Sequence, residues 1–352
     1  MNRYLPLAIL LLLVVFVQQL THWTGTPYYL TQLTMSAYYS VVIIGLCLLM
    51  GYAGQISLGH AGFFAIGGYM SAMLTTHNLI PYKDERWVIL LEKTGCLVAG
   101  QDIFGEAQLA FEPWAACIIA ILLALVTAYI IGIPVLKLKG HYLAMATLGF
   151  GIIVFRIFLA SEIFGEADGI SEVPGFTILP GITVDGGFSK RISNYYIAWS
   201  MVILVMILLI NLINSRVGRA LRAIHGAEDA ANAMGINTSR YKLNTFVLSA
   251  VLAAIAGVFL THYNGGIGPS EAGVMKSVRY VALVAIGGMA SLWGALSMGV
   301  ILNFLSLRGL FGSYDDAVFG IILIVIMLFA PEGVLRLNLW PKLKQRLRGH
   351  KE

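Results

Sequence analysis

The arrangement of this chain can be worked out from one polar stretch in its second half, residues 216–242, which reads RVGRALRAIHGAEDAANAMGINTSRYK. The stretch lies between two apolar runs, residues 197–213 and 246–260, and holds five Lys or Arg and two acidic residues. Apolar and small residues recur in it at helical spacing, namely Leu221, Ile224, Ala227, Ala231 and Met234. Because a mere connection would not need this periodicity, we predict a short amphipathic helix at a membrane surface that docks against another protein.

The composition places the chain in a membrane. Of its 352 residues, 58% are hydrophobic and 12% are charged, and the mean hydropathy is +0.81, which excludes a soluble globular domain. Because backbone groups in lipid must be bonded within their own segment, we predict one all-α polytopic helix bundle over residues 1–352. Ten apolar runs approach the ~20 residues that a membrane-spanning helix needs. They are residues 5–20, 30–50, 58–76, 113–136, 141–160, 195–213, 243–263, 277–289, 294–308 and 316–331.

The distribution of basic residues predicts the orientation. With ten spans and the amino terminus inside, the inner loops and ends hold 14 Lys or Arg and 4 Asp or Glu, against 9 and 14 in the rest of the chain. The positive-inside rule therefore places both termini, the 214–242 loop and a basic tail at 333–352 in the cytoplasm. Nucleic-acid binding is a poor explanation of the net charge of +5, because the basic residues are spread over several loops and a tail.

Two further polar segments, residues 77–112 and 161–194, then lie outside, and each has a net charge of −3. In the first, WVILL (87–91) and CLVAG (96–100) predict two short strands around a turn. In the second, the turn-rich PGITVDGGFS (180–189) suggests a further hairpin. Each segment is either a solvated cap or a landing surface for an extracytoplasmic protein, since structureless loops of this length are uncommon in compact bundles.

A glycine-rich stretch, GYAGQISLGHAGFFAIGGY at 51–69, combines six glycines with three polar residues. Tight helix packing explains most of the glycines. Irregular polar backbone at membrane depth, however, is tolerated only inside protein or beside a water-filled cavity. We therefore predict that Gln55, Ser57 and His60, with Thr147 in the second glycine-flanked span, line or abut a translocation pathway. Packing alone is the competing interpretation.

Motifs for catalysis are missing from the sequence. No G-x-x-x-x-G-K-[ST] occurs, so we do not expect this chain to hydrolyse ATP itself. No H-E-x-x-H or paired-cysteine spacing occurs, and we predict neither a metal nor a cofactor. Every Asp and Glu falls in a loop or at the end of a span, which disfavours a proton-coupled carrier.

Several segments together resemble the integral-membrane permease subunits of ABC importers for branched-chain amino acids, the Liv-type M subunits. They follow the order of that family over nearly the whole chain, and the combination is specific although each piece alone is weak. The segments are residues 51–69, GHYLAMATLGFGIIV (140–154), residues 215–257, VAIGGMASLWGALSMG (284–299) and FAPEGV (329–334). The resemblance implies a bundle like that of type II ABC importers.

The polar loop then resembles the coupling segment of ABC permeases, which carries an E-A-A pattern followed by a glycine. Asp229 stands where that pattern has alanine. The resemblance implies contact with a cytoplasmic ATPase subunit, and a surface helix lying on lipid is the alternative. The predicted coupling residues are Arg219, Arg222, Ile224, Glu228, Asp229, Ala230, Ala231, Met234 and Gly235.

The resemblance also implies partners and a function. The partners are a second homologous permease, two cytoplasmic ATPase subunits and an extracytoplasmic binding protein, assembled in a bacterial or archaeal inner membrane. The chain would form half of a pathway for branched-chain or similar hydrophobic amino acids. A permease of the same family for urea, short amides or another small solute is the alternative, and an autonomous carrier or channel is a further one. The 77–112 segment is long for the family, which bears on how the binding protein docks.

Overall fold

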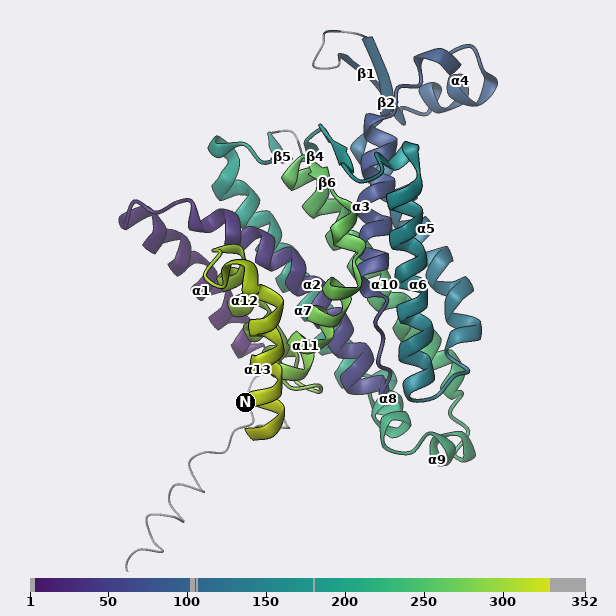
Figure 1. Cartoon of the computed structure of the whole chain (residues 1–352), viewed down its shortest axis with the longest axis vertical. Coiled ribbons are helices and arrows are strands. Elements are labelled where there is room, and N and C mark those ends of the chain that lie inside the picture. The colour runs from purple at the N-terminus through teal and green to yellow at the C-terminus, as the bar shows by residue number, and fades with distance from the viewer. Residues whose placement is uncertain (1–3, 102–104, 106, 180, 330–352) are drawn as a thin grey trace, which may run out of the picture.

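The structure of the chain is a computed structural model that describes residues 4–101, 105, 107–179 and 181–329. Ten of its helices follow the ten predicted spans (Figure 1). They are α1 Leu5–Trp23, α2 Tyr29–Ala53, α3 His60–Thr76, α5 Pro113–Val135, α6 His141–Ala160, α7 Arg191–Asn214, α10 Thr238–Asn264, α11 Val274–Gly287, α12 Leu292–Leu307 and α13 Asp315–Phe329. The predicted basic tail at 333–352 lies outside the described residues.

Six of these helices are long and apolar enough by themselves to cross a membrane, namely α1, α2, α5, α6, α7 and α10. The other four, α3, α11, α12 and α13, have 17, 14, 16 and 15 residues. At ~1.5 Å per residue they are shorter than the ~30 Å hydrocarbon core of a bilayer. The prediction of a helical membrane bundle is confirmed, whereas the count of ten complete crossings stays a prediction.

The centre of the bundle is formed by α2 and α10. Helix α2 packs against α7, α10 and α12, and α10 also packs against α3 and α5. Residues 36–51 of α2 are buried without interruption. Helix α1, in contrast, packs against α7 at the periphery and exposes Leu12 and Phe16. Such an exposed apolar face suits lipid rather than water.

Glycine allows α3 and α10 to approach each other closely. A Cβ atom at Gly257 of α10 would overlap the carbonyl oxygen of Phe64 in α3. Conversely, a Cβ atom at Gly67 of α3 would overlap the carbonyl oxygen of Ala254 in α10. This is the packing that small residues permit between membrane helices, where van der Waals contact replaces the hydrophobic drive.

The 77–112 segment differs from its prediction. Residues 87–91, predicted as a strand, lie in a helix, while the strand predicted at 96–100 pairs with a later one. Val88 and Leu91 face the strands at a spacing of three residues, so this short apolar run is helical rather than extended. A run of five apolar residues does not distinguish the two forms by periodicity. The elements are α4 Arg86–Lys93, β1 Leu97–Gln101 and β2 Ala107–Phe111, with β1 and β2 antiparallel.

The 161–194 segment contains three short strands, which form one antiparallel pair within the segment and one with a strand that follows α10. Strand β4 (Phe176–Leu179) pairs with β5 (Ile182–Val184), and β3 (Ile170–Ser171) pairs with β6 (Gly266–Ile267). Asp185 follows β5 directly, at the start of the turn that leads to α7. Its carboxylate accepts hydrogen bonds from Lys190 Nζ at 2.7 Å and from the Gly187 amide at 2.9 Å. Burial pushes the pKa of Asp185 upward, but these bonds outweigh it and hold the pKa below its usual range.

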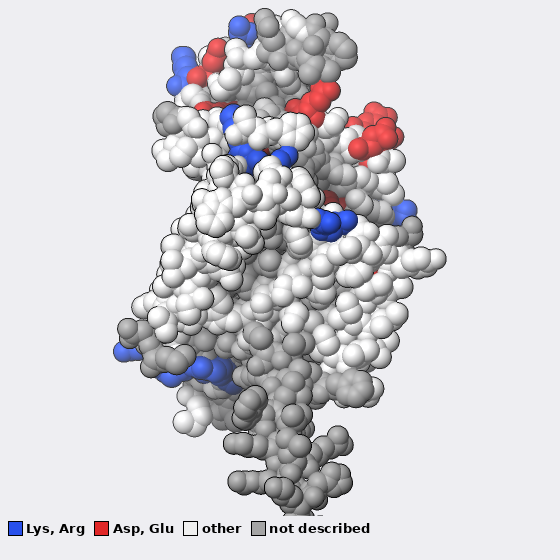
Figure 2. Space-filling view, turned by 90° about the vertical axis from the view of Figure 1, so that its left-hand side faces the viewer, with Lys and Arg blue, Asp and Glu red and all other residues white. Residues whose placement is uncertain are grey.

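The polar segments separate to the two ends of the bundle. Strands β1, β2, β4 and β5 and helix α4 lie at one end, and the first described residues lie at the other, together with the 215–237 loop (Figure 1). Figure 2 shows charged residues gathered toward the two ends of one face, with a broad band nearly free of charge between them. A band of this kind matches the apolar interior of a bilayer.

Candidate functional site

The polar stretch that separates α7 from α10 folds into two helices, α8 (Arg216–Gly226) and α9 (Glu228–Ala233). Ser215 begins α8, because its side-chain oxygen accepts a hydrogen bond from the Val217 amide at 3.1 Å. Leu221 and Ile224 are buried against the bundle, whereas Arg219 and Arg222 are exposed. The predicted amphipathic helix is therefore present, with its apolar face toward its own chain and its basic face outward.

Helix α9 is held against α10 by an ion pair. Glu228 lies 2.6 Å from Lys242 Nζ, and the Lys242 side chain is 11% exposed. Asp229 forms a longer pair with Lys139 at 3.7 Å, in which both side chains are largely exposed. Exposed pairs contribute little to stability, so the Glu228–Lys242 pair is the main electrostatic anchor of α9.

The nine predicted coupling residues divide into two groups. Ile224 and Ala231, at 3% and 5% exposed, pack against their own chain, and Glu228 is engaged by Lys242. A helix that lies on a bundle buries its apolar side there, and the role of Ile224 and Ala231 in coupling stays a prediction. The exposed group consists of Arg219, Arg222, Asp229, Ala230, Met234 and Gly235.

A second polar feature lies at the break between α2 and α3. Helix α2 ends at Ala53, and Gly54 takes a left-handed conformation with φ +68° that ends it. Residues 54–59 then run without helical structure to His60. Leu58 N donates to Thr147 Oγ1 of α6 at 2.9 Å. Amides that precede or begin a helix lack partners within it, and here side chains of other helices accept from them.

Three of the four predicted pathway residues, Ser57, His60 and Thr147, meet in one buried network. His60 Nδ1 lies 3.1 Å from Ser57 Oγ, and its Nε2 lies 2.7 Å from Ser249 Oγ of α10. The Ala61 amide donates to Ser277 Oγ of α11 at 3.2 Å. The network thus joins the α2–α3 break to α6, α10 and α11. Ser249 and Ser277 escaped the sequence analysis, although a serine within an apolar run is itself a signal of helix contact.

Gln55, the fourth predicted pathway residue, is placed differently. It is 2% exposed, and its side-chain oxygen has no hydrogen-bond partner among the described residues. A buried amide oxygen without a partner costs free energy of ~1–3 kcal/mol. The structure thus places Gln55 in the same segment as Ser57 and His60 but outside their network.

The helical loop and the α2–α3 break lie against each other. A Cβ atom at Gly54 would lie 2.8 Å from His225 Nδ1 of α8, so only glycine allows this approach without displacing the ring. Residues 54–59 therefore connect the surface loop, through Gly54, with the buried network around His60. This connection depends on tertiary packing and could not be predicted from the spacing of the residues.

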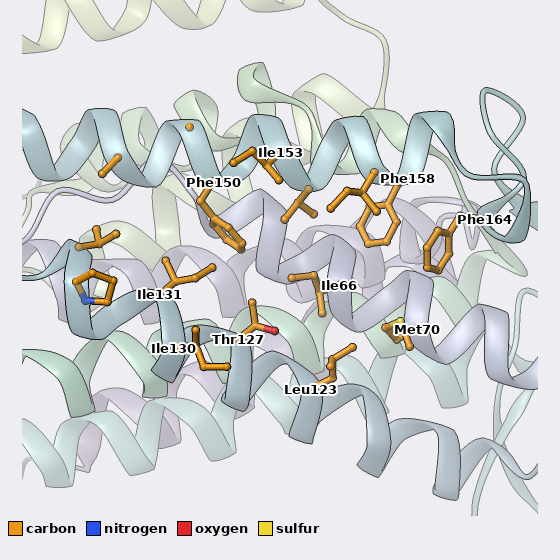
Figure 3. Close-up of a pocket in the computed structure, with 16 residues that line it drawn as sticks. Ile66, Met70, Leu123, Thr127, Ile130, Ile131, Phe150, Ile153, Phe158 and Phe164 are labelled. Carbon is orange, nitrogen blue, oxygen red and sulfur yellow. The ribbon is translucent and has the colours of Figure 1, made fainter.

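An apolar cavity of about 700 Å³ lies between α3, α5 and α6 (Figure 3). Ile66, Ile130, Phe150 and Phe158 contribute to its lining, and Thr127 carries the one hydroxyl among the lining residues. The predicted pathway residues are not among those that line it. An ionised solute would find few hydrogen-bond partners there, so we do not assign the pathway to this cavity.

A helix bundle with a band nearly free of charge on one face, a buried polar break and a basic helical loop is typical of a polytopic membrane protein. The chain matches the family described as branched-chain amino acid transport system / permease component over residues 28–327. It belongs to this family, and is therefore a multi-pass inner-membrane permease subunit.

Curated relatives carry matching names. The chain is 29% identical to the high-affinity branched-chain amino acid transport system permease protein LivM of Escherichia coli, over 88% of this chain and 70% of LivM. It is 27% identical to LivH of Salmonella typhimurium, over 88% of this chain and 96% of LivH. It is 26% identical to BraD of Pseudomonas aeruginosa, over 86% of this chain and 93% of BraD. No solved structure matches the chain.

Proposed function

We propose that this chain forms half of the translocation pathway of an ATP-driven ABC importer for branched-chain and similar hydrophobic amino acids. The observation that carries the proposal is the match to the permease family over residues 28–327. The names LivM, LivH and BraD, all of branched-chain amino acid systems, support the substrate class.

The same proposal includes three kinds of partner. LivM and LivH are both similar to this chain and both occur in Escherichia coli K12, which supports a second, homologous permease beside it. The exposed basic and small residues of α8 and α9 support contact with two cytoplasmic ATPase subunits. A soluble binding protein would deliver the amino acid to the opposite end, where α4 and the strand pairs lie.

Reconstitution of the whole complex tests this function. The chain, purified from its host by an affinity tag together with its partners, is placed in liposomes with radiolabelled L-leucine and the binding protein on one side and ATP on the other. We expect leucine uptake that needs both ATP hydrolysis and the binding protein. Replacing ATP by a non-hydrolysable analogue is the control, and it should abolish uptake.

Two results would overturn the proposal. Leucine uptake by the chain alone without ATP would make it an autonomous carrier or channel. ATP-dependent uptake of urea or acetamide, with no uptake of leucine, would move the substrate to another class of small solute while keeping the importer mechanism.

A further inference from the structure

A charged and aromatic cluster lies inside the bundle and shares no residue with the network around His60. It brings together Tyr39 of α2, Tyr69 of α3, Glu271 of the short 3₁₀ turn Pro269–Ala272, and Lys276 and Tyr280 of α11. The three tyrosines are between 0% and 5% exposed. No motif in the sequence marked these residues, because they come from four separate elements.

The centre of the cluster is one ion pair. Lys276 Nζ donates to Glu271 Oε1 at 2.8 Å and to the Tyr39 hydroxyl at 3.2 Å. The Tyr39 hydroxyl in turn donates to the same Oε1 atom at 3.1 Å. Lys276 also lies 4.7 Å from the centre of the Tyr39 ring, within the range of a cation–π interaction.

The cluster leaves specific polar groups unused. Glu271 Oε2 and the hydroxyls of Tyr69 and Tyr280 are buried, and none of them has a hydrogen-bond partner among the described residues. Lys276 has three N–H groups, and the two bonds above use two of them. Helix α3, which carries Tyr69, packs against the 3₁₀ turn that carries Glu271, and the ring centres of Tyr280 and Tyr39 lie 6.3 Å apart. The unused groups thus belong to elements that meet at the ion pair.

We propose that this cluster is a binding site for the zwitterion of an α-amino acid on its way through the permease. The α-ammonium group would donate to Glu271 Oε2, and the α-carboxylate would accept from the remaining N–H of Lys276 and from the hydroxyls of Tyr69 and Tyr280. Each unused group then finds a partner of suitable charge or polarity. This inference rests on the proposed function and names residues of the pathway itself.

An ion pair that served packing alone would be a poor choice at this place. Buried ion pairs often stabilise no more than apolar residues of the same volume, and an unpaired carboxylate oxygen adds a further cost. The side chains of Lys276 and Glu271 are 26% and 19% exposed, so the pair is only partly buried, although Glu271 Oε2 itself is buried.

The cluster adjoins the buried network at the α2–α3 break. Ser277, which accepts from the Ala61 amide, follows Lys276 directly in α11. A solute leaving the cluster would therefore next meet the segment 54–59, which Gly54 connects to α8. The order along this path is charged cluster, α2–α3 break and helical loop.

Leucine uptake by the reconstituted complex tests the site. Glu271→Gln keeps the volume but removes the charge, and we expect the KM for L-leucine to rise about tenfold or more. Tyr280→Phe removes an unpartnered hydroxyl, so it should also raise the KM for L-leucine. Because no hydrogen bond is lost, the stability of the fold should not fall. Co-purification of the partners should survive in both variants, which shows that the complex still assembles.

Tyr38→Phe is the matched control. Its hydroxyl is also buried and without a partner among the described residues, but its ring lies beside Phe259 and Tyr263, away from the ion pair. We expect the KM of this variant to match the unchanged complex. An equal rise in the Tyr38 and Tyr280 variants would overturn the proposal.

A double variant separates binding from structure. Glu271→Gln with Lys276→Met removes both charges and leaves packing volume, so a purely structural pair predicts restored uptake with an unchanged KM. A binding site predicts that uptake remains weak although the protein stays folded, as followed by thermal unfolding. Restored uptake would sink this proposal alone, whereas absence of ATP-driven uptake in the unchanged complex would sink the proposed function.

Discussion

Single glycines set the distance between α3 and α10, which makes one substitution a sharp test. Gly257→Ala would drive a methyl group into the Phe64 carbonyl, and overpacking of this kind costs about 1–3 kcal/mol. We expect a clear fall in the thermal unfolding temperature in detergent, followed by fluorescence-detected gel filtration.

Gly149 supplies the matched control for that substitution. It also lies within a helix, α6, but a Cβ atom there would meet nothing within 4 Å. Gly149→Ala should leave the unfolding temperature unchanged or raise it, because alanine favours a helix by ~1 kcal/mol over glycine in water. Similar falls in both variants would show that close approach of α3 and α10 does not limit stability.

Thr147 tests the break between α2 and α3 at the same scale. Thr147→Val keeps the shape of the side chain but leaves the Leu58 amide without its acceptor, at a cost of ~1–3 kcal/mol. We expect slower leucine uptake by an assembled complex, because the 54–59 segment loses a bond that positions it.

Thr75→Val is the corresponding control. Thr75 is buried as well, but its hydroxyl donates to Ser71 and Ala72 carbonyls of its own helix. Uptake should therefore be close to that of the unchanged complex. If the Thr147 variant transports leucine at the same rate as the Thr75 variant, Thr147 serves helix packing alone.

Among the elements, α9 offers the clearest test of partner contact. Ala230 is exposed on α9. Ala230→Trp would place a large ring in the proposed contact with an ATPase subunit, which only small side chains permit. We expect loss of co-purification with the ATPase subunits and loss of substrate-stimulated ATP hydrolysis, while the bundle stays folded. Gly235 is a less useful position, because its φ of +83° strains any other residue there.

Ala107→Trp is the control at the opposite end. Ala107 is likewise exposed, but it lies on β2, beside α4 rather than α9. Co-purification with the ATPase subunits should survive this change. Retention of both ATPase readouts by the Ala230 variant would mean that α9 is a surface helix on lipid.

At the scale of the whole molecule, the separation of the polar segments predicts topology. We expect the end with α8 and α9 to be cytoplasmic and the end with α4 to face outside. Cysteine introduced at exposed Asp84 or Asp168 should react with a membrane-impermeant maleimide in intact cells, and cysteine at Ala227 should not. Asp185 is unsuitable for labelling, because its carboxylate organises the turn before α7.

The labelling experiment requires that no native cysteine reacts with the maleimide. Cys47 and Cys117 are buried, whereas Cys96 is partly exposed, so Cys96→Ser should precede the labelling variants. Permeabilised cells provide the positive control for Ala227. Labelling of Ala227 in intact cells at the level of Asp84 would invert the orientation.

The sequence by itself determined the class of the protein, because membrane insertion depends on local properties. Apolar runs of helical length predict helices wherever they occur, and the positions of all ten runs agree with helices of the structure. Ser57 and His60 could likewise be singled out from the sequence, since polar residues among glycines are conspicuous within an apolar chain. A run as short as residues 87–91 was misassigned, because its neighbours rather than its pattern make it a helix.

Tertiary structure alone decided which residues meet. His60 and Ser249 are 189 positions apart in the sequence, and their contact exists because α3 and α10 pack through glycines. In the same way, packing turned Ile224 and Ala231 inward and brought Glu271 to Tyr39. The physical reason is that hydrophobicity and helical periodicity act within one segment, whereas contacts between segments depend on shape complementarity across the whole bundle.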